Sequence, residues 1–276
     1  MNETTLRTLN HWKENGDVHA SNIVGKDSEN YSGIKGQSLQ KHMSKYMEYR
    51  YKLKNSKNIL ERTKALNEFK TFAFDNNRDS LKKQIFSAQS KFIPTIMEEF
   101  LKLLIEPIAD QYNYNCRSSH AYSQMSIQSI PGGQPIVEIS AKDQDIAVYE
   151  SITLTINEKV QKVDIPILSI ECKTYLDKTM LEGAASTATR LKQGVTNTKF
   201  LVVTETYAVS SKVKKPRDID KIFVTKKTMH TKEDHTVSHC HKVIQMIYNY
   251  VNDHIGTSTK STKEIIEDGL SKGVIE

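Results

Sequence analysis

Residues 165–175 constrain the fold more than any other part of the chain. Residues 165–172 are almost all apolar and rich in β-branched side chains, which predicts a strand buried on both faces. Glu171 and Lys173 lie at the end of this run. Because residues two apart on a strand point to the same face, a carboxylate and an ammonium are expected side by side there. Cys172, between them, is expected to point the other way, into the core.

Two further carboxylates precede a second apolar run upstream. Asp143 and Asp145 lie in the sequence Lys-Asp-Gln-Asp-Ile of residues 142–146. Two carboxylates can hold a hard divalent cation, while water and phosphate fill its other positions. A neighbouring lysine can orient or deprotonate an attacking water and offset the charge that builds on a phosphate. This set of groups predicts phosphodiester hydrolysis; the alternative is an ion pair at a sheet edge, although an unpaired carboxylate is costly beside so apolar a strand.

The order Asp145, Glu171-Cys172-Lys173 resembles the catalytic signature of the PD-(D/E)xK nuclease superfamily. Longer pieces resemble subunits of the BbvCI-like type II restriction endonucleases. These pieces are residues 141–146, 170–176, 180–182, 187–192 and 200–205. Lys142 and Gln144, and not prolines, precede the two aspartates, which departs from the motif. The choice between Asp143 and Asp145 as principal ligand therefore stays open, with Asp145 favoured because it directly precedes the apolar run.

The resemblance implies a sequence-specific endonuclease of double-stranded DNA that depends on Mg²⁺, which Mn²⁺ can replace. It implies that Asp145 and Glu171 hold the metal, which polarises the scissile phosphate and lowers the pKa of a bound water. Lys173 would position that water for an in-line attack that leaves a 5′-phosphate. Glu98 is a candidate third metal carboxylate, because a Glu from the corresponding helix reaches the metal in several members. Negative charge near a helix start explains Glu98 or Glu99 equally well.

BbvCI-like enzymes consist of two different subunits that each cut one strand. The resemblance implies a similar second nuclease subunit here, and a homodimer is the alternative. Two other functions compete with this one: a non-catalytic DNA-binding subunit on a nuclease fold, and a repair or recombination nuclease that reads DNA structure. The intact set of Asp, Glu and Lys argues against the first, and base-specific footprinting would exclude the second.

The distribution of charge points to an anionic partner. The 276 residues carry a formal net charge of +6. Residues 1–92 hold 17 Lys and Arg against 10 Asp and Glu, whereas the rest of the chain holds 22 against 23. Basic charge gathered on one segment is typical of nucleic-acid binding, and a solvated helical surface is the alternative. Within this segment, the Tyr-Arg-Tyr-Lys-Leu-Lys run of residues 49–54 could contact phosphates, although packing is the commoner role of such tyrosines.

Several segments outside the catalytic motif favour contacts with DNA. Residues 112–134 form a long polar stretch, which we interpret as a loop that reads base edges in the major groove. A basic turn at residues 214–217 and a helix at 179–193 could hold backbone phosphate. The candidate DNA-contacting residues are Arg117, Ser119, His120, Lys142, Arg190, Lys214, Lys215 and Arg217.

The element pattern predicts an α/β (α+β) fold with a PD-(D/E)xK restriction-endonuclease-like core, a mixed central sheet flanked by helices in the order αβββαβ. Its three successive strands are expected at 145–151, 153–157 and 163–174. The predicted division is a basic N-terminal arm and helical subdomain that contacts DNA (1–92), a nuclease core (93–255) and a polar C-terminal tail (256–276). The remaining expected elements are a loose arm over 1–36 with one short helix, helices at 37–50, 56–74, 78–86, 94–108, 239–255 and 263–270, and strands at 199–205 and 221–226.

The sequence also predicts the compartment. No apolar run is long enough to span a membrane, and the first residues lack a signal pattern. The three cysteines have no zinc-like spacing, including Cys240 between His239 and His241. A reduced protein of the prokaryotic cytoplasm is expected.

Overall fold

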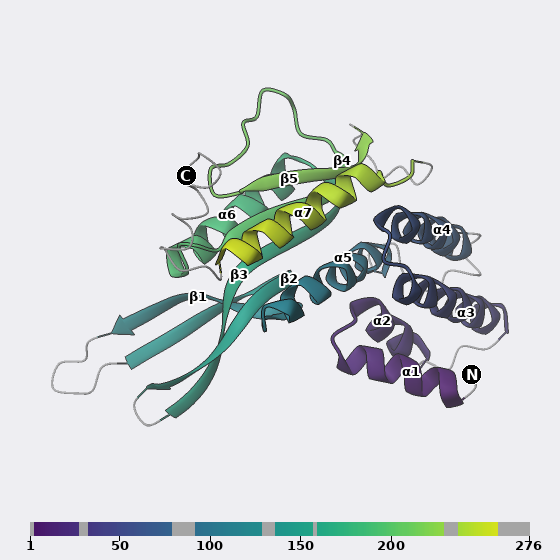
Figure 1. Ribbon diagram of the computed structural model, residues 1–276, viewed down its shortest axis with the longest axis horizontal. Coiled ribbons are helices and arrows are strands. Elements are labelled where there is room, and N and C mark those ends of the chain that lie inside the picture. The colour runs from purple at the N-terminus through teal and green to yellow at the C-terminus, as the bar shows by residue number, and fades with distance from the viewer. Residues whose placement is uncertain are drawn as a thin grey trace.

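The computed structural model describes residues 3–27, 33–78, 92–128, 136–156, 159–228 and 237–258. They form helices and strands arranged around one sheet (Figure 1). The helices are α1 (Glu3–Glu14), α2 (Val18–Asp27), α3 (Gly33–Asn55), α4 (Ile59–Arg78), α5 (Phe92–Gln111), α6 (Lys178–Gly194) and α7 (His241–Ser258). The strands are β1 (Asn115–Gln128), β2 (Ile136–Ile156), β3 (Lys159–Leu176), β4 (Lys199–Tyr207) and β5 (Lys221–Thr228).

The sheet is mixed, with its five strands in sequence order. The pairs β1–β2 and β2–β3 are antiparallel, whereas β3–β4 and β4–β5 are parallel. A parallel pair needs a crossover connection, and α6 provides it between β3 and β4. The expected mixed α/β core with the order αβββαβ is confirmed, as α5-β1-β2-β3-α6-β4.

Helices cover both faces of the sheet. In β4, Leu201 and Val203 pack into a cluster with α5 and α7, while Phe200 and Val202 pack into a second cluster with α6. Alternate residues of a strand point to opposite faces, so α6 lies on the face away from α5 and α7 (Figure 1). Burial on both faces explains why the run of residues 200–205 is continuously buried and apolar or neutral apart from Glu205.

The N-terminal third is more ordered than expected. The sequence predicts a loose arm with one short helix over residues 1–36, but most of them form α1 and α2. Gly16 adopts a φ of 78° in the turn between these helices, a conformation that glycine reaches without strain. Leu9, Ala20 and Ile23 are fully buried and belong to the same hydrophobic cluster as α5 and the sheet. Tertiary packing, and not a strong local pattern, orders this segment.

Two strand assignments from the sequence were wrong. The polar stretch interpreted as a recognition loop is mostly β1, which pairs along its length with β2. The strands expected at 145–151 and 153–157 are parts of one long strand, β2. The hairpin ends of β1, β2 and β3 extend beyond the helices, so few of their side chains are buried (Figure 1).

The other expected elements agree with α3, α4, α5, α6, β4, β5 and α7. The helices expected at 78–86 and 263–270 lie outside the described residues apart from Arg78, which ends α4. Among the described helices, none combines the length and apolar character that crossing a membrane requires.

Candidate active site

Asp145 and Glu171 lie where the β2–β3 ladder ends. The two strands pair from the hairpin side up to Ile146 and Ile170, and residues of β2 before Ile146 pair with β1. Asp145 and Glu171 are the next residues of each strand. The backbone N–H of Cys172 donates a hydrogen bond of 2.8 Å to Oδ2 of Asp145. The Asp145 side chain is therefore fixed against β3 at the point where the strand partners part.

A β-bulge aims Asp145 at this point. In the β1–β2 ladder, Arg117 pairs with Ala147 and Ser119 pairs with Gln144, so Asp145 and Ile146 together lie opposite one residue, Ser118. Bulges turn a side chain out of the regular alternation and occur often beside active sites. The Ser118 hydroxyl donates to the Gln144 carbonyl at 3.1 Å, which holds the bulge. Neither Ser118 nor the bulge was expected from the sequence.

Asp143 occupies a different environment from Asp145. Asp143 pairs with His120 in the regular β1–β2 ladder and is exposed, whereas Asp145 is half-buried. The electrostatic influences on Lys173 include Asp145. The structure thus brings Asp145 to the Glu171–Lys173 pair and leaves Asp143 on the solvent side of the strand.

Glu171 and Lys173 form the ion pair that their spacing predicted. Nζ of Lys173 lies 2.7 Å from Oε1 of Glu171, and the two side chains are 28% and 20% exposed. Burial lowers the pKa of Lys173, but Glu171 and then Asp145 outweigh it and raise the pKa above its usual value. Lys173 is therefore an ammonium at neutral pH, suited to orient a water and to offset negative charge.

Cys172 shows that a third carboxylate lies nearby. As expected, Cys172 points into the core, where it is 5% exposed. Burial raises the pKa of its thiol most, and the negative charges of Asp145, Glu98 and Glu171 raise it further. Glu98, on α5, is 8% exposed. Glu98, Asp145 and Glu171 thus act on one thiol from α5, β2 and β3, with the ammonium of Lys173 as the opposing charge.

Glu99, next to Glu98, belongs to a structural network. Its carboxylate accepts hydrogen bonds from the backbone N–H groups of His19 and Ala20 at the start of α2. It also accepts from the Tyr46 hydroxyl at 2.6 Å and from the Arg50 guanidinium at 3.0 Å. A carboxylate at a helix N-terminus satisfies amides that have no partner within the helix. Glu99 therefore joins α2 and α3 to α5.

This network extends to a second buried carboxylate. Arg50 donates to Asp17 at 2.7 Å, and Lys102 donates to the same carboxylate at 2.8 Å. The residues Asp17, Tyr46, Arg50, Glu99 and Lys102 are named the Arg50 cluster below.

The donor chemistry of the site fits a hard cation. Three carboxylates and one ammonium act electrostatically on the Cys172 thiol, so formal negative charge is in excess there. Mg²⁺ is usually held by one or two carboxylates together with water and substrate phosphate. Asp145 and Glu171 can supply those two. In the part of the chain described here, no group of three or more His, Cys, Asp or Glu side chains is arranged to hold a metal by itself.

The histidines near Cys240 do not form a metal cluster in the described residues. His239 is buried, its Nδ1 lies 2.9 Å from the Thr225 hydroxyl, and its Nε2 lies 3.9 Å from Glu205. Burial lowers its pKa to about 3. His230 and His235 lie outside the described residues.

The candidate DNA-contacting residues fall into two groups. Arg117 is exposed on β1, where it lies over the ring of Tyr149, and Lys142 is half-buried on β2. Ser119 and His120 belong to β1 as well, so the group lies on strands and not on the expected loop.

The second group lies between α6 and the β4–β5 connection. Arg190, Lys214 and Arg217 are exposed. The Thr189 hydroxyl donates to Asp218, which brings this connection to the end of α6 that carries Arg190. Lys215 donates to the carbonyls of Pro216 and Ile219, so its ammonium is engaged by its own loop.

Comparison with known proteins gives one family and one fold. The family model described as Bpu10I restriction endonuclease matches residues 89–263, which contain Glu98, Asp145, Glu171 and Lys173. The fold is similar to a solved chain described as "native BbvCI A2B2 tetramer at low resolution", with a TM-score of 0.66 and 17% sequence identity, over 89% of this chain and 97% of that chain. A search of curated protein sequences gives no match.

Proposed function

The chain belongs to the Bpu10I restriction endonuclease family, and from this premise we propose that it cuts one strand of its DNA site with Mg²⁺ at Asp145 and Glu171. Type II restriction endonucleases are site-specific deoxyribonucleases, so the family gives the reaction class and the substrate. The proposal concerns the catalytic residues, the metal, and which subunit cuts which DNA strand.

One observation carries the proposal: Asp145 meets the Glu171–Lys173 pair at the end of the β2–β3 ladder. The Cys172 amide fixes Asp145 at 2.8 Å, and Lys173 lies 2.7 Å from Glu171. Both contacts hold the side chains where β2 and β3 part, partly open to solvent, where a phosphate can approach. A group held on strands keeps the geometry that catalysis requires better than one on a loop.

Each residue has a separate role in the proposed hydrolysis. Asp145 and Glu171 would hold Mg²⁺, with Glu98 as a third carboxylate. When bound, Mg²⁺ supplies positive charge to the phosphate and lowers the pKa of water. Lys173 donates hydrogen bonds that orient the water for in-line attack on phosphorus. The P–O3′ bond breaks, which leaves a 5′-phosphate and a 3′-hydroxyl.

We propose that DNA is contacted by the N-terminal region, residues 1–92, and by the strand and α6 groups that include Arg117 and Arg190. Both arginines are exposed. The division into residues 1–92, a core of 93–255 and a tail of 256–276 remains part of this proposal. The solved BbvCI protein with the similar fold is an A2B2 tetramer. That assembly supports a second nuclease subunit as the partner here, which would cut the other strand.

The test uses a matched pair of substitutions on one strand. Asp145→Asn should lower the rate of cleavage of supercoiled plasmid in Mg²⁺ by at least about 10²-fold, because the metal loses a ligand. Asp143→Asn, two residues away on the solvent side, should lower it far less. Equal losses would refute the assignment of Asp145. Lys173→Ala should abolish cleavage while binding to duplex DNA persists.

The products test the division between subunits. The chain alone should convert supercoiled plasmid to the nicked form, and end-sequencing should place every nick on the same strand of one sequence. Linear product from the chain alone would show that it forms a complete enzyme by itself, and the one-strand proposal would be wrong.

A further inference from the structure

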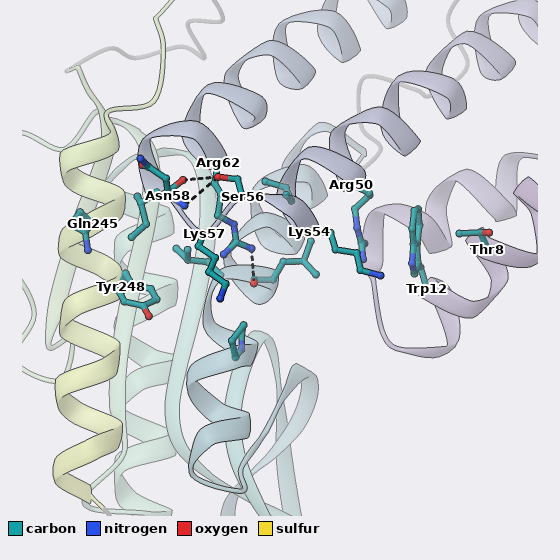
Figure 2. A pocket seen from close by; sticks show the side chains of 15 residues that line it. Thr8, Trp12, Arg50, Lys54, Ser56, Lys57, Asn58, Arg62, Gln245 and Tyr248 are labelled. Atoms are coloured by element: carbon teal, nitrogen blue, oxygen red, sulfur yellow. Dashed lines mark hydrogen bonds between the residues drawn. The ribbon is translucent and has the colours of Figure 1, made fainter.

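A groove on the helical side of the molecule is lined by cations. Its volume is about 920 Å³, and it is bounded by α1, the turn from α3 to α4, α5 and α7. Figure 2 shows Lys54, Lys57 and Arg62 between Tyr248 of α7 and Trp12 of α1. None of its lining residues belongs to the candidate active site. It is named the basic groove below.

The basic groove has no acidic lining residue among those described. Its charged residues are Arg50, Lys54, Lys57 and Arg62. Arg50 is already neutralised by the buried carboxylates of the Arg50 cluster. For Lys54, Lys57 and Arg62, by contrast, no described carboxylate lies within ion-pair distance. Other lysines nearby are paired, such as Lys52, which lies 2.8 Å from Glu68.

Arg62 is held in place for an anion. One of its terminal nitrogens donates to the Leu103 carbonyl at 2.9 Å, which fixes the guanidinium against α5 (Figure 2). Its Nε is buried and has no hydrogen-bond partner among the described groups. A guanidinium has five N–H donors in a rigid fork that matches phosphate. Because Nε is buried, an anion in the groove would meet the terminal nitrogens of the guanidinium and not Nε.

The charge changes at one end of the groove. A neighbouring hollow of about 420 Å³ shares Trp12, Arg50 and Leu103 with it. That hollow is lined by four carboxylates, Glu14, Asp17, Glu106 and Asp110, and by three cations, Arg50, Lys102 and Arg117. Asp17 already pairs with Arg50 and Lys102. The excess of positive charge is therefore confined to the side of the basic groove that carries Lys54, Lys57 and Arg62.

We propose that the basic groove binds the sugar–phosphate backbone of DNA outside the bases that are cut. Phosphate oxygens only accept hydrogen bonds, and Lys54, Lys57 and Arg62 offer only donors. A neutral peptide would leave the three cations without a counter-charge. The inference rests on the proposed function, since it takes DNA as the ligand, and it assigns a second contact region apart from the catalytic residues.

The test measures how salt weakens binding to duplex DNA, without divalent metal so that no strand is cut. Each phosphate contact contributes about 0.9 to the slope of log affinity against log salt concentration. Lys54→Gln/Lys57→Gln should reduce that slope by about 1.8, and Arg62→Gln should reduce it by about 0.9. Lys64→Gln is the matched control, because Lys64 is exposed on α4 but does not line the groove, and should leave the slope unchanged. Lys54 and Lys57 are exposed as well, so their variants should fold normally.

DNA duplexes with progressively longer flanks on either side of the cleavage site locate the contact between the groove and DNA. The difference in salt slope between wild type and the double variant should appear only when the flank is long enough to reach the groove. Equal slopes for wild type and all variants on the longest duplex would overturn the proposal. So would variants that change the sedimentation mass of the protein and not the slope, since the groove would then join protein chains. If a mononucleotide bound to the groove while the variants left the salt slope of DNA binding unaltered, the groove would instead be assigned to a free nucleotide.

The proposed function is tested separately in the same samples. Cleavage of these duplexes by the wild-type protein in Mg²⁺ depends on Asp145 and Glu171. If the wild-type protein cleaves DNA but the groove variants have the same salt slope as wild type, only the groove proposal is wrong. If the variants change the salt slope but the wild-type protein does not cleave, only the catalytic assignment is wrong.

Discussion

Lowering the pH from about 7.5 to about 5 should reduce the free energy of unfolding by about 4 kcal/mol. Two buried histidines cause this loss. Burial lowers the pKa of His42 to about 3, and burial lowers that of His239 to about 3 as well. An unfolded histidine titrates near 6.5. Both are therefore neutral in the folded protein at a pH where the unfolded chain already binds protons.

The surroundings of the two histidines explain their low pKa. Nε2 of His42 lies 3.1 Å from Nε2 of His19, and the rings of Phe69 and Phe92 pack around the pair. A proton on either ring would place a charge among aromatic side chains. His239 is enclosed beside Glu205, Lys70 and Lys226, and its backbone is hydrogen-bonded to Asn67 of α4.

The sign and size of the effect follow from linkage. A group whose folded pKa is depressed binds fewer protons when folded, so stability rises with pH between the two pKa values. From 6.5 down to 5 is about 1.5 pH units, and each unit is worth about 1.4 kcal/mol, which gives about 2 kcal/mol for each histidine. Burial and His42 lower the pKa of His19 too, so His19 adds to the loss, and about 4 kcal/mol is the part that His42 and His239 contribute. Glu205 has a pKa near 2, because Lys70, His239 and Lys226 outweigh the effect of its burial. The stability that the ionised Glu205 contributes is lost as the pH falls below about 4.5, so the free energy of unfolding decreases a second time there.

Urea unfolding at several pH values measures the free energy of unfolding and its dependence on pH directly. His42→Phe should reduce the loss between pH 7.5 and 5 from about 4 to about 2 kcal/mol, since one titrating group is gone. His11→Gln is the control, because His11 is exposed on α1, and it should keep the full response. A wild-type unfolding free energy that does not change over this range would refute the reasoning.

Three further substitutions test the packing. Arg50→Met removes the guanidinium of the Arg50 cluster from two buried carboxylates, so it should cost about 3–5 kcal/mol of stability by calorimetry; a loss below about 1 kcal/mol would show that the carboxylates are not truly buried as ions. Gly194→Ala and Gly183→Ala are a matched pair in α6. A Cβ on Gly194 would clash with the Ser123 carbonyl oxygen, so thermal unfolding should show a loss of about 1–3 kcal/mol. A Cβ on Gly183 meets nothing within 4 Å and should instead stabilise the helix by up to about 1 kcal/mol; equal effects at the two positions would contradict the close approach of α6 to β1.

The catalytic strand could be predicted from the sequence because its pattern is local. A long apolar run buried on both faces has few alternatives to a central strand, and Glu171 and Lys173 then share a face by alternation alone. The same holds for β4 and α6, whose patterns of buried residues are also local in the sequence. Cys172 followed from the same alternation, and it does point into the core.

The elements that the sequence did not reveal depend on distant partners. β1 is polar because much of it lies on an arm beyond the helices, and its pairing with β2 makes it a strand. The choice between Asp143 and Asp145 depends on a bulge, which exists only in the register of β1 against β2. The cations of the basic groove were visible as charge in the sequence. Their lack of carboxylate partners among the described residues appears only when α3, α4, α5 and α7 are brought together.

Helix α5 connects the N-terminal helices to the catalytic strands through neighbouring residues. Glu99 binds the amides of α2 and the guanidinium of Arg50, while Glu98 acts on the thiol of Cys172 between the catalytic strands. Successive residues of a helix point about 100° apart, so one helix can serve two different neighbours at adjacent positions. Any shift of α5 that frees Glu99 must also move Glu98. The N-terminal helices therefore have a structural role apart from the proposed contact with DNA, because their packing fixes the helix that carries the candidate third carboxylate.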